Sequence, residues 1–132
     1  MSADLPVLTV DVVKDALRRA AVGADDPVRA TWHCPELDFL PCVRLLQEGG
    51  ARLLTLAAMR EEGDDLVLTY TFELGRGSYL VIGTPTRDRT VGSLFSFFAS
   101  ADFLEREVNL LFGVKFLGHP NLPHPVRGEP TP

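Results

Sequence analysis

Two glutamates and two histidines near the C-terminus have the types and spacing that could support chemistry. Glu105 and Glu107 could form an acid–base pair, and His119 and His124 could offer two imidazoles to a metal. On a helix, however, residues two apart point about 200° away from each other, so the two glutamates cannot share one substrate. No Asp, Glu or Cys accompanies the histidines at ligand spacing. We therefore expect no catalytic pair and no metal site here.

The residues around His119 favour a structural role for this histidine. Gly118 permits unusual backbone angles and Pro120 restricts its own φ, which predicts a defined turn whose imidazole hydrogen-bonds a neighbour. Asp102 and Arg106 are four residues apart with the acid first, the favourable order for an ion pair near a helix N-terminus. Helix stabilisation thus explains much of the local charge.

The cysteines give no strong signal of metal binding or nucleophilic catalysis. Cys34 and Cys42 are separated by seven residues and lack the C-x-x-C spacing of zinc and iron–sulfur loops. Cys34 could act as a nucleophile with His33 or His119 as its base. Alternating residue types instead place Cys34 on the core side of a strand beside Trp32, which predicts a buried, inert thiol.

Gly75 and Gly77 come after an alternating strand pattern, as the glycines of a phosphate-binding loop would. The residues after them show another strand pattern and not the helix whose N-terminus would hold an anion, so the two glycines indicate a hairpin turn. Nucleotide-binding, hydrolase and metalloprotease motifs do not occur in the sequence. We expect no cofactor and no self-contained active site.

The composition is that of an ordinary globular domain. The chain has 132 residues, of which 45% are hydrophobic and 23% charged, with a net charge of -5. The acidic balance argues against a nucleic-acid binder, which needs Lys and Arg to neutralise phosphates. The N-terminal residues show no basic segment followed by an apolar run, and no stretch of 18 uninterrupted apolar residues occurs, so we expect neither a signal peptide nor a membrane span. We expect a cytoplasmic protein that reaches a membrane only through partners.

Periodicity predicts the elements in the first half of the chain. Thr9 is the expected N-cap of a first helix that stops at Gly23, and residues 28–34 alternate as a strand. A second helix should begin near Asp38, with Pro41 in its first turn, and end at the Gly49-Gly50 pair. The side chains expected to face inward from it are Phe39, Leu40, Val43 and Leu46.

The second half should supply most of a sheet. The apolar run 51–59 predicts a central strand covered on both faces, with a helix over 53–60 as the alternative. Residues 66–74 and 79–82 should form an antiparallel hairpin, and 90–101 a short helix or helical turn. A last helix should start at an Asp102 N-cap, with Glu105 reaching back in a capping box, and end at Gly113.

These elements predict a single α+β domain over residues 1–119, followed by an extended Pro-rich tail over 120–132. About four strands should form a mixed or mainly antiparallel sheet with helices packed against it.

Residues 105–120 carry a resemblance to a known family. Within Glu-Arg-Glu-Val-Asn-Leu-Leu-Phe-Gly-Val-Lys-Phe-Leu-Gly-His-Pro, eight residues match a signature that runs E-R-E-x-x-D-x-x-G-I-x-F-x-G-H-P. This stretch resembles the respiratory-chain NADH dehydrogenase 30 kDa subunit family, found in proton-pumping NADH:quinone oxidoreductase (respiratory complex I), and related subunits of energy-converting [NiFe] hydrogenases. The matching residues are Glu105, Arg106, Glu107, Gly113, Phe116, Gly118, His119 and Pro120, and Val114 replaces the isoleucine.

The resemblance implies a non-catalytic peripheral-arm subunit without a cofactor. It would dock on the large subunit, of the 49-kDa type or the hydrogenase type, beside other peripheral-arm subunits at the inner face of the cell membrane. Glu105, Arg106 and Glu107 would form a charged helix face. Phe112, Gly113, Phe116, Gly118, His119 and Pro120 would shape the helix end and the following turn of the interface. Apolar residues near 105–120 should then be exposed in the isolated chain.

Two departures from the family pattern leave alternatives open. Asn109 and Leu110 replace a Tyr-Asp pair, and residues 121–126 replace an Arg-Arg-containing stretch of the basic tail. From the sequence as given, we also expect the long C-terminal extension of many complex I members to be missing. The alternatives are the equivalent subunit of a membrane-bound energy-converting [NiFe] hydrogenase and an unrelated small α+β enzyme or ligand-binding domain. The latter requires a pocket with convergent polar groups.

Overall fold

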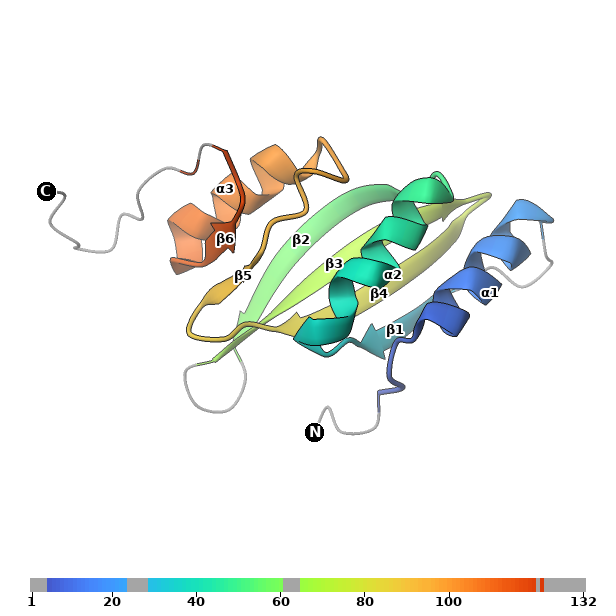
Figure 1. Cartoon of the computed structure of the whole chain (residues 1–132), viewed down its shortest axis with the longest axis horizontal. Helices are drawn as coiled ribbons and strands as arrows, with labels where there is room; N and C mark the ends of the chain where they lie inside the picture. Colours follow the sequence, from blue (N-terminus) through green and yellow to red (C-terminus); the bar gives the residue numbers. More distant parts are fainter. Residues whose placement is uncertain (1–4, 24–28, 61–64, 121, 123–132) are drawn as a thin grey trace, which may run out of the picture.

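A computed structural model describes residues 5–23, 29–60, 65–120 and 122 of the chain. Three helices and six strands form an α+β fold in which a four-stranded sheet is the central element (Figure 1). The elements are α1 (Val10–Ala21), β1 (Arg29–His33), α2 (Glu36–Glu48), β2 (Arg52–Arg60), β3 (Leu66–Gly75), β4 (Ser78–Pro85), β5 (Thr90–Gly92), α3 (Ala101–Phe112) and β6 (Lys115–Leu117).

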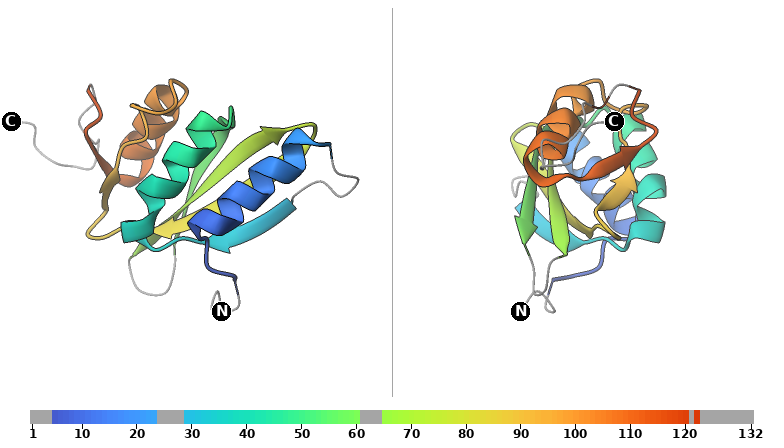
Figure 2. Two further views of the ribbon diagram at one scale, coloured as in Figure 1. Left: turned by 45° about the vertical axis from the view of Figure 1, so that its right-hand side comes forward. Right: turned by 90° about the vertical axis from the view of Figure 1, so that its left-hand side faces the viewer.

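The main sheet is mixed, with the strand order β1-β4-β3-β2. β2, β3 and β4 form an antiparallel meander, and β1 adds to β4 in parallel. The right-hand view of Figure 2 shows α1 and α2 on one side of this sheet. The predicted α+β class is therefore confirmed, and the parallel β1–β4 pair makes the sheet mixed.

The strand β3 and its hairpin to β4 agree with the predicted pattern. Burial alternates at every residue from Leu66 to Gly75, and Gly75 pairs with Ser78 across a two-residue turn. The turn residues Arg76 and Gly77 both have positive φ, 56° and 78°, as a type I′ turn requires. The right-handed twist of the strands favours this turn, which is why the local sequence predicts it.

Two expectations about burial were wrong. The run 51–59 forms a strand, but β2 is an edge strand with Thr55, Ala57 and Met59 exposed. The apolar run suggested cover on both faces, whereas only the helix side of β2 is covered. In α2, Phe39, Val43 and Leu46 are buried as expected, but Leu40 is 48% exposed.

Helix ends depart from the prediction in α2 and agree with it in α1. Thr9 caps α1, because its Oγ1 accepts a hydrogen bond from the Val12 amide at 3.2 Å. The helix α2 begins at Glu36 after Pro35, two residues before Asp38, so Pro41 lies beyond the first turn and not within it. The helix α2 ends at Glu48 with Gly49 as its C-cap, as predicted.

The C-terminal elements lie at the end of the molecule opposite α1 (Figure 1). Residues 90–92 form β5, which pairs in parallel with β6, and the amides of Phe97 and Phe98 both bond the Leu94 carbonyl in a helical turn. The prediction for 90–101 therefore holds for the turn and not for β5. The Phe98 ring contacts the Phe72 ring at a centroid distance of 5.4 Å, which ties this region to the helix-covered side of the sheet.

No helix in the described part of the chain is long and apolar enough to cross a membrane.

Candidate functional site

The structure places the signature residues on α3, on β6 and in the turn after β6. These residues divide into three groups by their exposure. Glu105 and Phe116 are buried, with Glu105 fully covered, whereas Glu107, Gly118 and Pro120 are exposed. Arg106, Phe112 and Gly113 are partly exposed, and His119 is partly exposed only through its backbone, because its imidazole is fully buried. The expected charged helix face therefore lacks Glu105, which points into the domain.

Glu105 holds the loop before α3 against the helix. Its carboxylate accepts a hydrogen bond of 2.6 Å from the Ser93 hydroxyl and one of 2.7 Å from the Leu94 amide. Burial raises the pKa of Glu105, and the two donors oppose that rise. The predicted capping box was wrong, because Ser100 is the N-cap and Asp102 lies in the first turn.

His119 closes the turn after β6 onto the start of α3. Its Nε2 lies 3.1 Å from Asp102 Oδ1 and 3.4 Å from the Asp102 carbonyl oxygen. Gly118 has φ of 91°, a left-handed conformation that glycine adopts without strain. Asp102 also lies 3.4 Å from Arg106 Nε, the predicted ion pair. The expectation of a turn whose imidazole bonds a neighbour is confirmed.

Asn109 stands where the family pattern has a different residue, and it has a structural function. This buried side chain donates a hydrogen bond of 2.9 Å from Nδ2 to the Val114 carbonyl. Gly113 between them has φ of 74° and ends the helix as predicted. The Arg89 guanidinium donates to the Phe112 carbonyl at 2.8 Å, so the C-terminus of α3 is held from two directions.

The outward side of these elements carries exposed apolar residues that are not part of the signature. We call it the α3–β6 surface. Its members are Phe103 (61% exposed), Leu110 (41%), Leu111 (67%) and Leu117 (63%). Phe103 and Leu110 are seven residues apart and share one face of α3, with Arg106 and Glu107 between them. The expected exposure of apolar residues near 105–120 is confirmed.

Sequence reasoning did not single out these four residues individually, although a signal was present. Phe103 and Leu110 have helical spacing on the side of α3 opposite the buried Glu105 and Val108. Without knowledge of which side faces the core, the two apolar stripes of α3 cannot be told apart.

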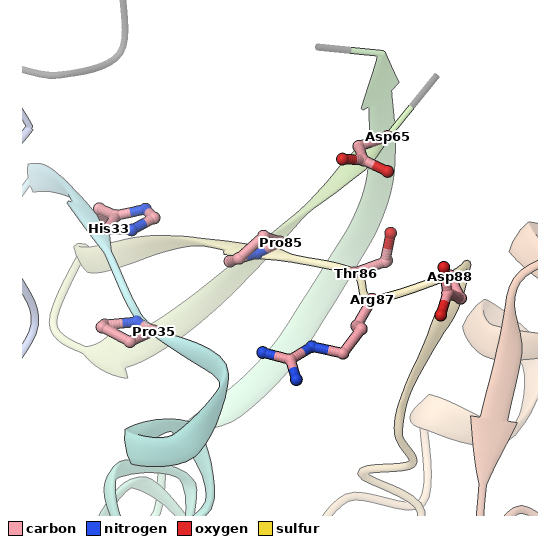
Figure 3. Close-up of a pocket in the computed structure, with 7 residues that line it drawn as sticks. All are labelled: His33, Pro35, Asp65, Pro85, Thr86, Arg87 and Asp88. Atoms are coloured by element: carbon pink, nitrogen blue, oxygen red, sulfur yellow. The ribbon is translucent and has the colours of Figure 1, made fainter. Parts of the chain in front are cut away.

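A pocket lies at the ends of β1, β3 and β4 (Figure 3). It has a volume of about 480 Å³ and is lined by His33, Pro35, Asp65, Pro85, Thr86, Arg87 and Asp88. Figure 3 shows these side chains spread along the chain, with His33 and Asp88 at opposite ends in this view. The Thr86 hydroxyl is already bonded to the Leu66 carbonyl at 2.9 Å. The lining therefore does not bring several polar groups to one point.

The thiols are buried, as expected for Cys34. Both Cys34 and Cys42 are inaccessible, and a hydrogen bond with Cys42 together with burial raises the pKa of Cys34 far above its usual range. A thiol that stays protonated is a poor nucleophile. Within the described residues, no group of three His, Cys, Asp or Glu side chains could hold a metal ion. His124 lies outside those residues.

The fold and the exposed apolar surface define a small α+β domain suited to assembly with other proteins. The chain belongs to the family described as "Respiratory-chain NADH dehydrogenase, 30 Kd subunit", whose model matches residues 32–130. It is thus a subunit of a respiratory complex of the complex I type. Membership in this family excludes the hypothesis of an unrelated small enzyme or ligand-binding domain.

The solved structures that are similar to this fold include the following two. One is a trypsin-resistant fragment of Nqo5, with a TM-score of 0.66 and 22% identity over 87% of this chain and 100% of that chain. The other belongs to the membrane-bound sulfane sulfur reductase, an archaeal respiratory membrane complex, with a TM-score of 0.66 and 22% identity over 88% of this chain and 74% of that chain. No curated protein matches the chain significantly.

Proposed function

We propose that the chain is a non-catalytic, structural subunit of the peripheral arm of a proton-pumping NADH:quinone oxidoreductase. In this proposal the α3–β6 surface docks on the large, 49-kDa-type subunit that carries the quinone site, and the complex holds the chain at the cytoplasmic face of the membrane. The observation that carries the proposal is the exposure of Phe103, Leu110, Leu111 and Leu117 around the family signature. Several exposed apolar side chains on contacting elements such as α3 and β6 are typical of a protein interface.

The buried signature residues would act by keeping this surface in shape. Glu105 fixes the loop at Ser93 and Leu94, and His119 fixes the turn after β6 to Asp102. A surface that is ordered before binding loses less conformational entropy on association than a flexible one. Among the interface residues named by the signature, Arg106 and Glu107 would contribute polar contacts between the apolar side chains of α3, and Pro120 would add an exposed apolar contact in the turn after β6.

The second candidate is the equivalent subunit of a membrane-bound energy-converting [NiFe] hydrogenase or a related complex. The equal similarity to Nqo5 and to the sulfane sulfur reductase, each with a TM-score of 0.66, favours keeping this candidate. The fold serves both kinds of complex, so the identity of the co-purifying large subunit distinguishes them. A quinone-site subunit supports the first proposal, and a hydrogenase large subunit supports the second.

Affinity purification of the tagged chain from its native host tests the proposed docking surface. We expect the wild-type chain to retain a large subunit and Phe103→Glu to lose it, because the substitution buries a charge in the centre of the interface. Loss of one anchor of this kind costs at least about 2 kcal/mol, or roughly 30-fold in affinity. Leu40→Glu is the matched control, since Leu40 is similarly exposed but lies on α2.

Retention of the large subunit by Phe103→Glu at the wild-type level would refute docking through the α3–β6 surface.

The absence of catalysis is tested separately with the purified chain. We expect no NADH oxidation without partner subunits, and measurable turnover by the isolated chain would overturn the structural role.

A further inference from the structure

The side of the main sheet that faces away from the helices forms a second surface, which we call the open face. Strand pairing places its residues in three rows, two of which cross all four strands and one of which crosses β2, β3 and β4. All of them are exposed or partly exposed. The rows are Met59–Val67–Pro85, Ala57–Thr69–Gly83–His33 and Thr55–Thr71–Val81–Thr31.

The described helices leave this face uncovered. The helices α1, α2 and α3 contact β3, β4 and β2, respectively. The buried residues of β3 and β4 alternate with those of the open face along each strand, so their side chains point to the other side of the sheet. Tyr70 and Phe72, for example, contact Phe39 and Phe98 on the helix side, whereas Thr69 and Thr71 face the other way. The right-hand view of Figure 2 shows the same one-sided arrangement of α1 and α2.

The open face carries no Asp, Glu, Lys or Arg in its three rows. Charged residues make up 23% of the chain, and a free surface normally has a fraction at least that high. The charges begin only in the next row, where Arg52 and Glu73 form an ion pair at 3.4 Å. A neutral centre with charges at its border is the arrangement found in protein interfaces.

Gly83, near the middle of the open face, supports the same conclusion. Its backbone is not left-handed, and a Cβ at this position would meet only Val67 Cγ1 at 3.6 Å and the Trp32 carbonyl at 3.8 Å, which are ordinary contacts. Alanine would therefore fit, and glycine costs about 0.5–1 kcal/mol relative to alanine inside a strand. A strand glycine that the fold does not require often marks close approach by another chain.

The dimensions of the face restrict what can cover it. Four strands about 4.8 Å apart and three rows about 6.8 Å apart give roughly 400 Å². A stable interface between two proteins buries about 800 Å² on each partner, so this face is too small to hold a second copy of the chain by itself. Two helices packed about 8–10 Å apart match its width of about 19 Å.

We propose that the open face is covered by a pair of helices, uncharged on the side that contacts it, from a neighbouring subunit of the complex. The helices complete a helix–sheet–helix arrangement, which buries both faces of the sheet. The inference rests on the proposed function as a subunit, but it concerns a surface separate from the α3–β6 surface. It adds a second contact that holds the chain in the assembly.

Thiol labelling in the native complex tests this proposal. Ala57→Cys places an accessible thiol on the open face, and Gln47→Cys places one on the exposed side of α2 as a control. The native Cys34 and Cys42 are buried and should give little background. We expect maleimide to label both variants equally fast in the isolated chain, and Ala57→Cys at least tenfold more slowly than Gln47→Cys in the purified complex.

The possible outcomes separate the two proposals. Equal labelling of both variants in an intact complex overturns the covered open face and leaves the proposed function standing. Slow labelling of Ala57→Cys already in the isolated chain also overturns the proposal that a neighbouring subunit covers the open face. If this protection depends on protein concentration, a second copy of the chain covers the face. If it does not, the chain's own residues cover the face. Failure of the tagged chain to retain any partner overturns the proposed function and this inference together.

A charge substitution gives an independent test in the same complex. Ala57→Lys should weaken retention of partner subunits at least tenfold, whereas Gln47→Lys should leave it unchanged, because only the first places a charge in the covered face. Ala57 is exposed on an edge strand, so the isolated variant should keep the wild-type unfolding midpoint. Wild-type retention by Ala57→Lys would overturn the inference.

Discussion

The buried carboxylate of Glu105 allows a quantitative prediction about what stabilises the α3–β6 region. Replacing Glu105 by alanine removes the acceptor for two donors, the Ser93 hydroxyl at 2.6 Å and the Leu94 amide at 2.7 Å. Leu94 is fully buried, so water cannot replace the lost acceptor at its amide. Glu105→Gln keeps the shape and one carbonyl acceptor. The two variants therefore separate loss of charge from loss of both bonds.

The expected magnitudes can be worked out from these contacts. A buried donor left without a partner costs about 1–3 kcal/mol of folding free energy. Removing the Glu105 carboxylate also removes the cost of burying its charge, and this gain offsets part of the loss of the two hydrogen bonds. We expect Glu105→Ala to lower the free energy of unfolding by about 2–3 kcal/mol and Glu105→Gln by about 1 kcal/mol. For a domain of this size the alanine variant corresponds to a drop of roughly 6–15 °C in Tm.

Urea unfolding followed by circular dichroism measures these differences. Glu107→Gln is the control, since Glu107 is exposed on the same helix and should change stability by less than about 0.5 kcal/mol. A loss below about 0.5 kcal/mol for Glu105→Ala, or equal losses for the alanine and glutamine variants, would refute the role assigned to the carboxylate.

The pH dependence of the same variants has a defined sign. Burial raises the pKa of Glu105, so the folded state binds this proton more tightly than the unfolded state. The contribution of this bound proton to the free energy of unfolding is fully present below the pKa of Glu105 in the unfolded chain, about 4.3. It is lost as pH rises through the higher pKa of Glu105 in the folded state. The difference in the free energy of unfolding between wild type and Glu105→Gln should therefore become smaller as pH rises. A gap that widens would contradict the burial of this group.

Two further predictions concern local backbone structure and are measured by urea unfolding of the isolated chain. Thr9→Ala should cost about 1 kcal/mol, because it removes the acceptor for the Val12 amide, and an unchanged midpoint would show that the cap does not contribute. Gly77→Ala should cost about 1–2 kcal/mol through its φ of 78° alone, since no atom lies within 4 Å of the added Cβ. Gly83→Ala is its control and should be neutral or slightly stabilising, and equal losses at the two glycines would contradict the backbone argument.

The elements that sequence predicted correctly depend on neighbours along the chain. Thr9 caps its helix with a side chain three residues from the bonded amide, and the alternation of β3 needs only the period of a strand. The hairpin at Arg76 and Gly77 results from the turn geometry that two positive φ angles permit. Each of these depends on interactions within a few residues, so the local sequence carries the information.

The errors concern residues whose environment is set by distant segments. The apolar run of β2 was expected to form a central strand. Whether β2 is central depends on whether β1 pairs with the edge of β2 that β3 leaves free. β1 pairs with β4, which lies some fifty residues further along the chain, so β2 remains at the edge. Leu40 was expected to face inward with its helical neighbours, and the position of α2 on the sheet leaves it exposed.

The candidate site shows the same division between local and distant information. The residue types of the 105–120 stretch were enough to indicate the family, because a signature of eight matching residues is specific without any knowledge of packing. Packing alone decided that Glu105 turns inward to Ser93 and Leu94 and that Phe103 and Leu111 remain outside. A helix with apolar residues on two sides can bury either side, and contacts with the sheet and with the loop before α3 select one of them.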